Sequence, residues 1–383
     1  MTLYQRAELE TWTMPFCPQP GTWTLDWEGI VAEYPCVAAM AGCWQDPRWH
    51  AEGDVLIHTR RVCEALTAMD AWRNLPATAR SIVFAAALFH DVGKPACTRV
   101  EEDGSITSKG HSNRGVSLVR QLFYRDGVAP LACRESICAL VRHHGVPLGF
   151  LNKNPDRAAI LASVSARCDW LSLVALADAM GRECAERGEL ISRVELFQEL
   201  CAERDCLRTP RTFASPHSRF VFARTDDALA GYEAYDDSRF DVILMSGLPG
   251  AGKDEWVRQN CAGMNVISLD ELRESMNVAP EDEQGTVVAA AKERAREFAR
   301  AAQPFVWNAT NVSRDLRGGL VRLLAGYKAR VRIVYLETPY EELLKRNRTR
   351  PKPVPTAVIN RLIEKLDVPD LSEAHFVEWI CNG

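Results

Sequence analysis

A glycine-rich stretch directly after an apolar segment constrains this chain more than any other feature. Asp241 to Ser246 is predicted as a buried strand, and a helix is expected from Asp254; between them stand Gly247, Leu248, Pro249, Gly250, Ala251, Gly252 and Lys253. Glycines let backbone N–H groups curl around an anion, and a helix N-terminus favours negative charge. The order strand, loop, helix therefore predicts a site for the phosphates of ATP or another NTP. The alternative is an ordinary strand-to-helix turn with a solvated lysine.

The residue after Lys253 departs from the usual pattern of such loops. Ser or Thr commonly stands there, and its hydroxyl helps to hold Mg²⁺. This chain has Asp254 followed by Glu255. A carboxylate can bind Mg²⁺ directly or through water, but it also repels the phosphates. The sequence leaves open how Mg²⁺ is held.

Short apolar runs alternate with helical stretches in this part of the chain. The runs are Val242–Met245, Val266–Leu269, Phe305–Asn308 and Val331–Leu336. This alternation is typical of an α/β fold in which helices wrap a parallel sheet. Asp270 follows the second run, where it can accept the proton of a hydroxyl or cap a helix. The other polar candidates at this edge are Arg273, Thr310, Asn311, Arg346 and Arg350, the last two expected on one helix face as a lid.

Four motifs in this region occur together in one family. The order GLPGAGKDEW, ISLDELR, WNATN and RNRTRPKPVP resembles the phage-type 5′-hydroxyl polynucleotide kinases over about residues 240–369. The resemblance implies a P-loop kinase fold. It also implies that Lys253 binds the donor NTP, that Asp270 is the general base toward a 5′-OH, that Arg273 contacts the acceptor's adjacent phosphate, and that Arg346 and Arg350 form the lid.

Histidines and acids stand in an ordered series in the first half of the chain. The candidate metal ligands are His58, His90, Asp91, His111, His144 and Asp178, in a region where apolar residues recur three and four apart. Ile137, Leu140 and Val141 place His144 on the inward helix face, and Asp178 has the same spacing in its own segment. An acid on an inward face is costly unless it is paired or binds metal. A single histidine here would more often be an ordinary core residue.

This series resembles the HD-domain phosphohydrolases across about residues 50–200. The resemblance implies an all-α fold and two divalent transition metals, such as Mn, Co, Ni or Fe, held by the six residues, with Asp91 in the catalytic centre. Imidazole and carboxylate suit such ions, and a metal pair activates water and holds a phosphate ester.

Composition and length set the remaining limits. The 383 residues suggest two to three domains, expected as an extension (1–45), a helical domain (46–200), a connector with some short strand (201–238) and a P-loop domain (239–383). The absence of a long apolar run and of a signal sequence predicts a cytoplasmic protein with no membrane partner. The 13 cysteines are scattered, which favours reduced thiols. A net charge of −5 limits any polyanion contact to a local patch, best placed at Lys345–Lys352.

The two halves together resemble the bacterial HD-Pnk fusion, an RNA end-healing enzyme. The resemblance implies phosphorylation of RNA or DNA 5′-OH ends and removal of 2′,3′-cyclic, 2′- or 3′-phosphate, with an RNA ligase acting afterwards. Two alternatives stay open. One is a small-metabolite or nucleoside kinase whose HD module clears nucleotides, and the other is a nucleotide-sensing regulator without turnover.

Overall fold

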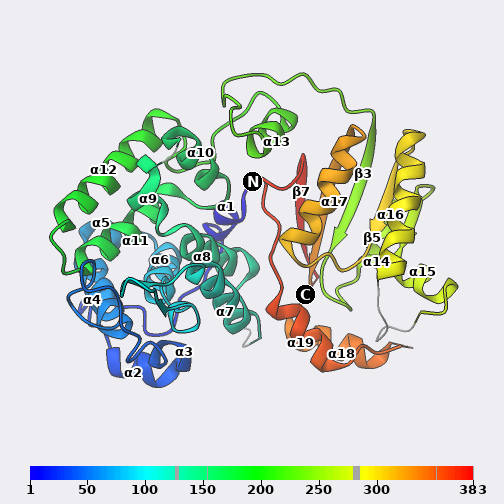
Figure 1. The fold of residues 1–383 in the computed structure, drawn as a ribbon. Coiled ribbons are helices and arrows are strands. Elements are labelled where there is room, and N and C mark those ends of the chain that lie inside the picture. The colour runs from blue at the N-terminus through cyan, green and yellow to red at the C-terminus, as the bar shows by residue number, and fades with distance from the viewer. Residues whose placement is uncertain (126–128, 153, 279–284, 351, 383) are drawn as a thin grey trace. The chain divides into compact units, whose positions relative to one another are not determined.

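The chain folds into two units, Met1–Thr212 and Phe213–Gly383. The structure is a computed structural model that describes residues 1–125, 129–152, 154–278, 285–350 and 352–382. Figure 1 shows that the first unit is built from helices and the second around a sheet. The predicted fold class, a helical domain followed by an α/β domain with a parallel sheet, is confirmed.

The first unit is helical apart from one hairpin. Its helices are α1 (Leu3–Ala7), α2 (Trp27–Glu33), α3 (Pro35–Ala38), α4 (Val55–Ala68), α5 (Asp70–Arg73), α6 (Ala77–Phe89), α7 (His111–Arg125), α8 (Leu131–His143), α9 (Val146–Gly149), α10 (Pro155–Ser165), α11 (Cys168–Gly181) and α12 (Arg187–Glu203), with 3₁₀ turns η1 (Lys94–Ala96) and η2 (Phe150–Asn152). The antiparallel hairpin of β1 (Arg99–Val100) and β2 (Ile106–Thr107) corrects the all-helix prediction. It forms because Asp103 caps the turn by accepting from Ser105 N, and Gly104 takes a left-handed conformation.

Helix α6 lies at the centre of this unit. Every side chain from Ser81 to Phe89 is buried, as expected for a helix that is apolar on all sides. It packs against α4, α8 and α11. Its carboxyl end, which leads into His90, therefore opens among three other helices.

The first 45 residues also belong to the helical unit. Tyr4 Oη donates to Ser163 O over 3.1 Å, and Trp12 N donates to Thr78 Oγ1 over 3.2 Å. Both Tyr4 and Trp12 are buried. This segment therefore contributes to the core of the first unit.

The second unit is a five-stranded sheet with helices on both faces. Its elements are α13 (Pro216–Arg224), β3 (Phe240–Ser246), α14 (Lys253–Asn260), β4 (Asn265–Ser268), α15 (Leu269–Ser275), α16 (Gly285–Arg300), β5 (Phe305–Asn308), α17 (Arg314–Gly326), β6 (Ala329–Glu337), α18 (Tyr340–Thr349), α19 (Thr356–Glu364) and β7 (Phe376–Cys381). The order is β4-β5-β3-β6-β7, and every neighbouring pair is parallel. Strand β7 was not predicted from the sequence.

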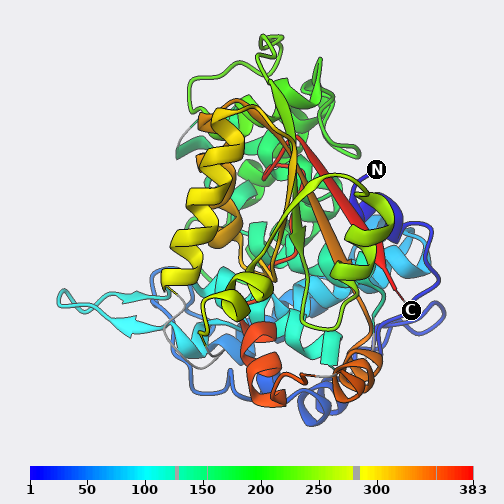
Figure 2. The same cartoon turned by 90° about the vertical axis from the view of Figure 1, so that its right-hand side faces the viewer.

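Alternating side chains of the strands build two apolar layers. Leu244 packs with residues of α16 and α17 on one face, and Met245 packs with Val257 of α14 on the other. Figure 2 shows α16 and α17 on one side of the sheet and α14 on the opposite side. Because strand residues alternate between faces, one apolar strand supplies both layers.

The segment expected as a connector is divided between the two units. Residues 201–203 finish α12, and residues 216–224 form helix α13 rather than short strand. Arg219 of α13 donates to Leu371 O and His375 O, and Arg224 donates to Glu373 O. These bonds attach α13 to the segment that leads into β7.

The state of the cysteines and the apolar length of the helices concern both units. All 13 cysteines are free thiols, and eight are buried. Among the described residues, no single helix is long and apolar enough to cross a membrane; α10 and α11 reach that length and apolarity only together, across a bend of 109°.

Candidate functional site

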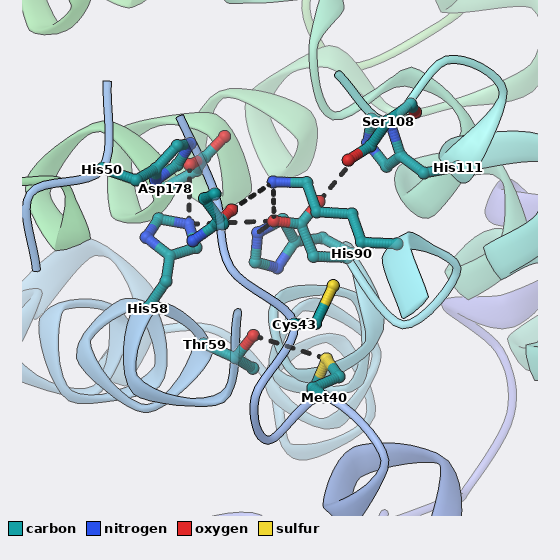
Figure 3. Close-up of polar contacts among 12 residues, drawn as sticks. Met40, Cys43, His50, His58, Thr59, His90, Ser108, His111 and Asp178 are labelled. Atoms are coloured by element: carbon teal, nitrogen blue, oxygen red, sulfur yellow. Dashed lines mark hydrogen bonds and ion pairs between the residues drawn. The ribbon is translucent and has the colours of Figure 1, made fainter. Parts of the chain in front are cut away.

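Five separate segments bring the predicted metal ligands of the first unit together. His58 lies on α4, His111 opens α7, and Asp178 lies on α11, while His90 with Asp91 and His144 directly follow α6 and α8. Figure 3 shows His58, His90, His111 and Asp178 converging from their different segments. All but His111 are buried.

Three of the histidines are held in the same way. Nδ1 of His90, His111 and His144 lies 2.7–2.8 Å from the backbone carbonyl three residues earlier, at Ala87, Ser108 and Val141 respectively. A carbonyl only accepts, so Nδ1 must carry a proton in each ring, and Nε2 offers its lone pair whenever the ring is neutral. This outer hydrogen bond is the usual arrangement behind a metal-binding imidazole.

The Nε2 atoms lack adequate partners of their own. His90 Nε2 is buried and makes no hydrogen bond to the residues that the structure describes, although Asp91 Oδ2 lies 3.1 Å away. His111 Nε2 and His144 Nε2 lie 3.4 Å apart, and Ser112 Oγ lies 3.4 Å from His111 Nε2. Two imidazole lone pairs that face each other at this distance repel unless a proton or a cation lies near them. The cluster therefore fits a metal site.

Asp91 lies between two groups of candidate ligands. Its Oδ2 lies 3.1 Å from His90 Nε2 and 3.9 Å from His58 Nε2, whereas Oδ1 lies 3.3 Å from His111 Nε2 and 3.9 Å from His144 Nε2. Each group has atoms close enough together to share one ion. Asp91 thus belongs to both groups, which fits a site for two ions.

His58 is oriented by carboxylates rather than by a backbone carbonyl. Its Nδ1 lies 2.8 Å from Glu52 Oε1, and its Nε2 lies 3.1 Å from Asp178 Oδ1. Arg182 also pairs with Asp178 through both carboxylate oxygens, at 3.0 and 2.9 Å. Asp178 thus has partners on both sides and is not an isolated buried charge.

The electrostatics of the cluster favour a bound positive charge. Burial alone raises the pKa of Asp91, but His90 and Lys94 hold it well below its usual range. Burial raises the pKa of Asp178 as well, and Arg182 and His58 overcome that effect and lower it. Burial lowers the pKa of His144 to about 3, so this ring is neutral. Ionised carboxylates beside a neutral imidazole are a suitable environment for a divalent cation.

One glycine sets the spacing between two of these segments. A Cβ on Gly93 would lie 2.1 Å from His111 O and 2.6 Å from Gly115 N. Only glycine lets the turn after Asp91 approach the start of α7 this closely. That approach brings His111 within reach of Asp91.

Sequence reasoning missed several residues of this centre. Glu52 and His50 precede α4, where no helical period exists to reveal them, and Glu52 Oε1 also lies 2.8 Å from His50 Nδ1. Lys94 Nζ lies 2.6 Å from Asp91 Oδ2 and donates to Gln45 Oε1 over 2.7 Å. The spacing His-Asp-x-Gly-Lys was a visible signal for Lys94; Gln45 had none.

In the second unit the predicted phosphate loop joins β3 to α14. Gly247, Gly250 and Gly252 have φ values of 144°, 87° and 93°, in the region that favours glycine. A Cβ on Gly247 would also lie 2.5 Å from Leu336 O of β6. Lys253 opens α14, and its Nζ donates to Gly247 O and Leu248 O over 3.0 Å each.

The loop lysine lies in a charged environment. Burial lowers the pKa of Lys253 to about 8, against the opposing effects of Asp254 and Asp270, while Arg350 lowers it further. The ammonium group of Lys253 thus responds to charges from three segments, the start of α14, α15 and the residue after α18. A phosphate bound there would favour the charged form of Lys253.

Asp270 lies on the first turn of α15, one residue later than the strand-end position that we predicted. Strand β4 ends at Ser268, whose side chain accepts from Glu271 N and caps the helix. The N-cap alternative for Asp270 is therefore wrong. Its carboxylate is 66% exposed and accepts from Arg273 Nη1 over 2.6 Å. Asp270 and Arg273 form a pair that a solvent-borne acceptor can reach.

The loop after β5 holds Thr310 and Asn311 beside the phosphate loop. Gly247 N donates to Thr310 O over 2.8 Å, and Asn311 Nδ2 donates to Met245 O over 2.7 Å. The side chain of Asn311 thus supports β3. Arg317 Nη1 in turn donates to Asn311 O over 3.1 Å.

The predicted lid differs from the expected helix face. Arg346 lies on α18, but the helix ends at Thr349, and Arg350 has an extended conformation with φ −70° and ψ 147°. The shared-face prediction is wrong because a proline follows Arg350 in the sequence and disfavours the helical region before it. Three charges of the basic stretch are paired, Lys345 and Arg346 with Glu342 and Lys352 with Glu274.

Comparisons with protein families divide the chain in the same order as the structure. Residues 55–178 match the HD domain family, and residues 242–369 match an AAA domain family. An HD domain and a P-loop kinase-like domain stand in one chain. The second implies nucleotide and Mg²⁺ binding, and the first implies a divalent metal.

Individual relatives cover smaller parts. The multifunctional CCA protein of Psychromonas ingrahamii is 34% identical over 112 residues, which are 29% of this chain and 24% of that protein. The chain thus matches about a quarter of the length of this curated relative. Among solved structures, a kinase-like protein from Chloroflexus aurantiacus (15% identity, TM-score 0.31) covers 38% of this chain and 86% of its own. A gluconokinase from Sinorhizobium meliloti (19% identity, TM-score 0.28) covers 38% and 83%.

Proposed function

We propose that this chain is a bifunctional RNA end-healing enzyme. Its second unit would transfer a phosphoryl group from an NTP to the 5′-OH end of RNA or DNA, and its first unit would remove a 2′,3′-cyclic, 2′- or 3′-phosphate from an RNA end. The observation that carries the proposal is the presence of a phosphate loop and a two-ion His/Asp cluster in one chain. A broken RNA with a 5′-OH and a 2′,3′-cyclic phosphate needs both reactions before a ligase can seal it.

In the kinase reaction, the roles follow from charge and exposure. The loop N–H groups and Lys253 hold the donor phosphates, and Arg346 and Arg350 supply further positive charge. Asp270 accepts the proton of the attacking 5′-OH. Its partner Arg273 orients the carboxylate and contacts the phosphate next to the acceptor hydroxyl. The exposure of Asp270 suits an acceptor as large as a polynucleotide end.

In the phosphohydrolase reaction, the cluster positions the cations. His58, His90, Asp91 and Asp178 would hold one divalent ion, and Asp91, His111 and His144 the second. Ions bound there supply a nucleophilic water and neutralise charge on the phosphate ester. The backbone carbonyls behind three imidazoles and Glu52 behind the fourth fix the ring orientations on which this depends.

The test is one oligoribonucleotide with defined ends. The full chain is incubated with a 5′-OH, 2′,3′-cyclic-phosphate RNA, an NTP labelled at the γ-phosphate, and Mg²⁺, Mn²⁺, Co²⁺, Ni²⁺ or Fe²⁺ in separate reactions. Both RNA ends are then analysed. We expect label at the 5′ end and free 2′,3′ hydroxyls at the other end.

Two outcomes would support the other functions. Labelling of nucleosides or small metabolites without labelling of the RNA would favour a metabolite kinase. Nucleotide binding without phosphorylation of any acceptor would favour a nucleotide-sensing regulator. Either result contradicts the RNA end-healing proposal.

A further inference from the structure

Two residues at the phosphate loop have exchanged chemical character relative to the usual P-loop arrangement. In P-loop NTPases Mg²⁺ is held by the Ser or Thr that follows the loop lysine and by an Asp from a second strand. In this chain Asp254 follows Lys253, and Asn308 is the last residue of β5, the strand that pairs with β3 on one side. The hydroxyl position carries a carboxylate, and an amide stands at the strand end.

The two side chains are in direct contact. Asn308 Nδ2 donates to Asp254 Oδ1 over 2.7 Å. An ionised carboxylate only accepts, so the amide nitrogen must face Asp254 and the amide oxygen must point elsewhere. Asn308 is 9% exposed, and its Oδ1 makes no hydrogen bond to any residue that the structure describes. This carbonyl oxygen is therefore available to a water or a cation.

Glu255, the acid that follows Asp254, is engaged with residues of its own helix. Glu255 accepts from Arg258 Nε over 3.1 Å and also contacts Gln259, so it is engaged along the outer face of α14. Its side chain is 50% exposed. Of the two acids that follow Lys253, only Asp254 contacts the end of β5.

We propose that Asp254 supplies the carboxylate and Asn308 the neutral oxygen of the Mg²⁺ site that serves the donor nucleotide. The site would still contain one neutral oxygen and one carboxylate. The carboxylate would come from the residue after the loop lysine, and the neutral oxygen from the residue at the strand end. Mg²⁺ takes oxygen ligands and is commonly held by one or two carboxylates together with substrate phosphates. The inference rests on the proposed kinase function of this unit but not on the identity of its acceptor.

The position of Asp254 limits the repulsion that its charge exerts on the phosphates. It lies in the first turn of α14, where the helix dipole stabilises negative charge. It also follows Lys253, whose ammonium group it influences electrostatically. A bound Mg²⁺ between Asp254 and the phosphates would turn the remaining repulsion into attraction.

The experiment measures metal-dependent nucleotide binding without any acceptor. Calorimetric titration with a non-hydrolysable ATP analogue, with and without Mg²⁺, gives the factor by which the metal strengthens binding. Mn²⁺ electron paramagnetic resonance in the presence of the analogue measures the ion directly. The variants are Asp254→Ser, Asn308→Asp, the double variant carrying both, and Glu255→Gln as the matched control, each checked for folding by circular dichroism.

The double variant makes the test decisive. Asp254→Ser should reduce the metal-dependent gain in affinity about tenfold or more, as loss of groups in a metal site commonly does. The double variant restores a hydroxyl and a carboxylate in the usual places and should recover most of the gain. Glu255→Gln should keep the wild-type gain.

Two results would overturn the inference. One is an Asp254→Ser variant that keeps the wild-type gain from Mg²⁺ and the wild-type Mn²⁺ signal. The other is an equal loss of analogue affinity with and without metal, which would make Asp254 a support for Asn308 only. Because no acceptor is present, a failed RNA kinase assay would leave these measurements unaffected, so the two failures are distinguishable.

Discussion

Glu52 Oε1 accepts a hydrogen bond from His58 Nδ1 over 2.8 Å, and this bond fixes how His58 faces the cluster. Both side chains are fully buried. Burial raises the pKa of Glu52, but hydrogen bonds to His50 and His58 outweigh it and lower that pKa. An ionised Glu52 keeps the proton on Nδ1 of His58, so the lone pair of Nε2 faces the cluster, where Asp178 Oδ1 lies 3.1 Å away.

Glu52→Gln should therefore weaken metal binding in the first unit. We expect metal affinity and phosphohydrolase activity to fall about 10- to 100-fold, the usual effect of losing such an outer partner. Metal content after dialysis, measured by mass spectrometry, reports affinity independently of activity. NTP-dependent phosphorylation by the second unit should be unchanged.

Glu64→Gln is the matched control for this variant. Glu64 lies on α4, the helix that carries His58, and its exposed pair with Arg60 has side chains 50% and 56% exposed. Loss of such a surface pair is worth at most about 1 kcal/mol. Equal metal content in Glu52→Gln and Glu64→Gln proteins would show that Glu52 does not orient His58.

The two proposed activities should be separable by single substitutions. Lys253→Ala or Asp270→Ala should abolish 5′ phosphorylation and leave removal of end phosphate largely intact, whereas His90→Ala or Asp91→Ala should do the reverse. Both reactions are followed on the same RNA, which carries a 5′-OH and a 2′,3′-cyclic phosphate. The physical reason is that each change removes a charge or ligand from one unit only.

Arg258→Ala is the control for the kinase variants, because Arg258 lies on α14 with its side chain 74% exposed. It should retain both activities. If Lys253→Ala or His90→Ala abolished both activities while the protein remained folded, the proposal of two independent sites would be wrong.

Local patterns in the sequence predicted much of the fold. Strand β5 has the predicted bounds, and β3, β4 and β6 differ by one or two residues at each end. These segments are short apolar runs that the parallel sheet buries on both faces, so composition alone reveals them. Strand β7 was missed because its burial pattern mixes exposed, partly buried and buried residues.

The candidate sites were predictable where residues follow a motif or a helical period, and not where distant segments meet. His144 followed from the apolar spacing of α8, but Glu52 reaches His58 from an irregular segment. The contact between Asp254 and Asn308 joins residues 54 apart in sequence. Such pairings depend on strand order and register, which no local pattern contains.

A buried ion pair should be essential to the stability of the second unit. Arg317 is fully buried and donates to both carboxylate oxygens of Glu373 over 2.8 Å each. Glu373→Ala would leave the Arg317 charge unpaired, and we expect the free energy of unfolding to fall by about 3–5 kcal/mol. Thiol labelling of buried Cys261 in increasing urea reports this unit directly.

Two variants test the cause of that loss. Glu378→Ala removes a carboxylate that is 44% exposed and lies 3.8 Å from Arg332. It should cost no more than about 1 kcal/mol. Replacing the pair together, by Arg317→Met with Glu373→Leu, should recover much of the stability because no charge is left buried. A double variant as unstable as Glu373→Ala would point to lost packing as the cause.

Stability of the second unit should also fall in acid because of His375. Its Nδ1 accepts from Val331 N over 3.1 Å, its ring stacks on Phe220, and its Nε2 lies 3.2 Å from His217 Nδ1. Burial lowers the pKa of His375 to about 4, and the charge of His217 lowers it further, against Asp236. The pKa is depressed in the folded state, so the unfolded chain takes up the proton first. Stability is therefore complete above pH 6.5 and declines as pH falls toward 4.

His375→Asn isolates this contribution, because its amide oxygen can accept from Val331 N but does not titrate. Proton uptake by this histidine in the unfolded chain should lower the free energy of unfolding of the wild-type protein by roughly 2 kcal/mol at pH 5 relative to pH 7. This follows from about 1.36 kcal/mol for each pH unit between the two pKa values. Urea unfolding at both pH values, followed by tryptophan fluorescence, gives the change in the free energy of unfolding between pH 7 and pH 5 for the wild type and for the variant. Loss of the Phe220 stacking lowers the stability of the variant at both pH values and cancels in the comparison. Equal pH dependence in the wild type and the variant would mean that other groups, such as the buried carboxylates, cause the acid sensitivity.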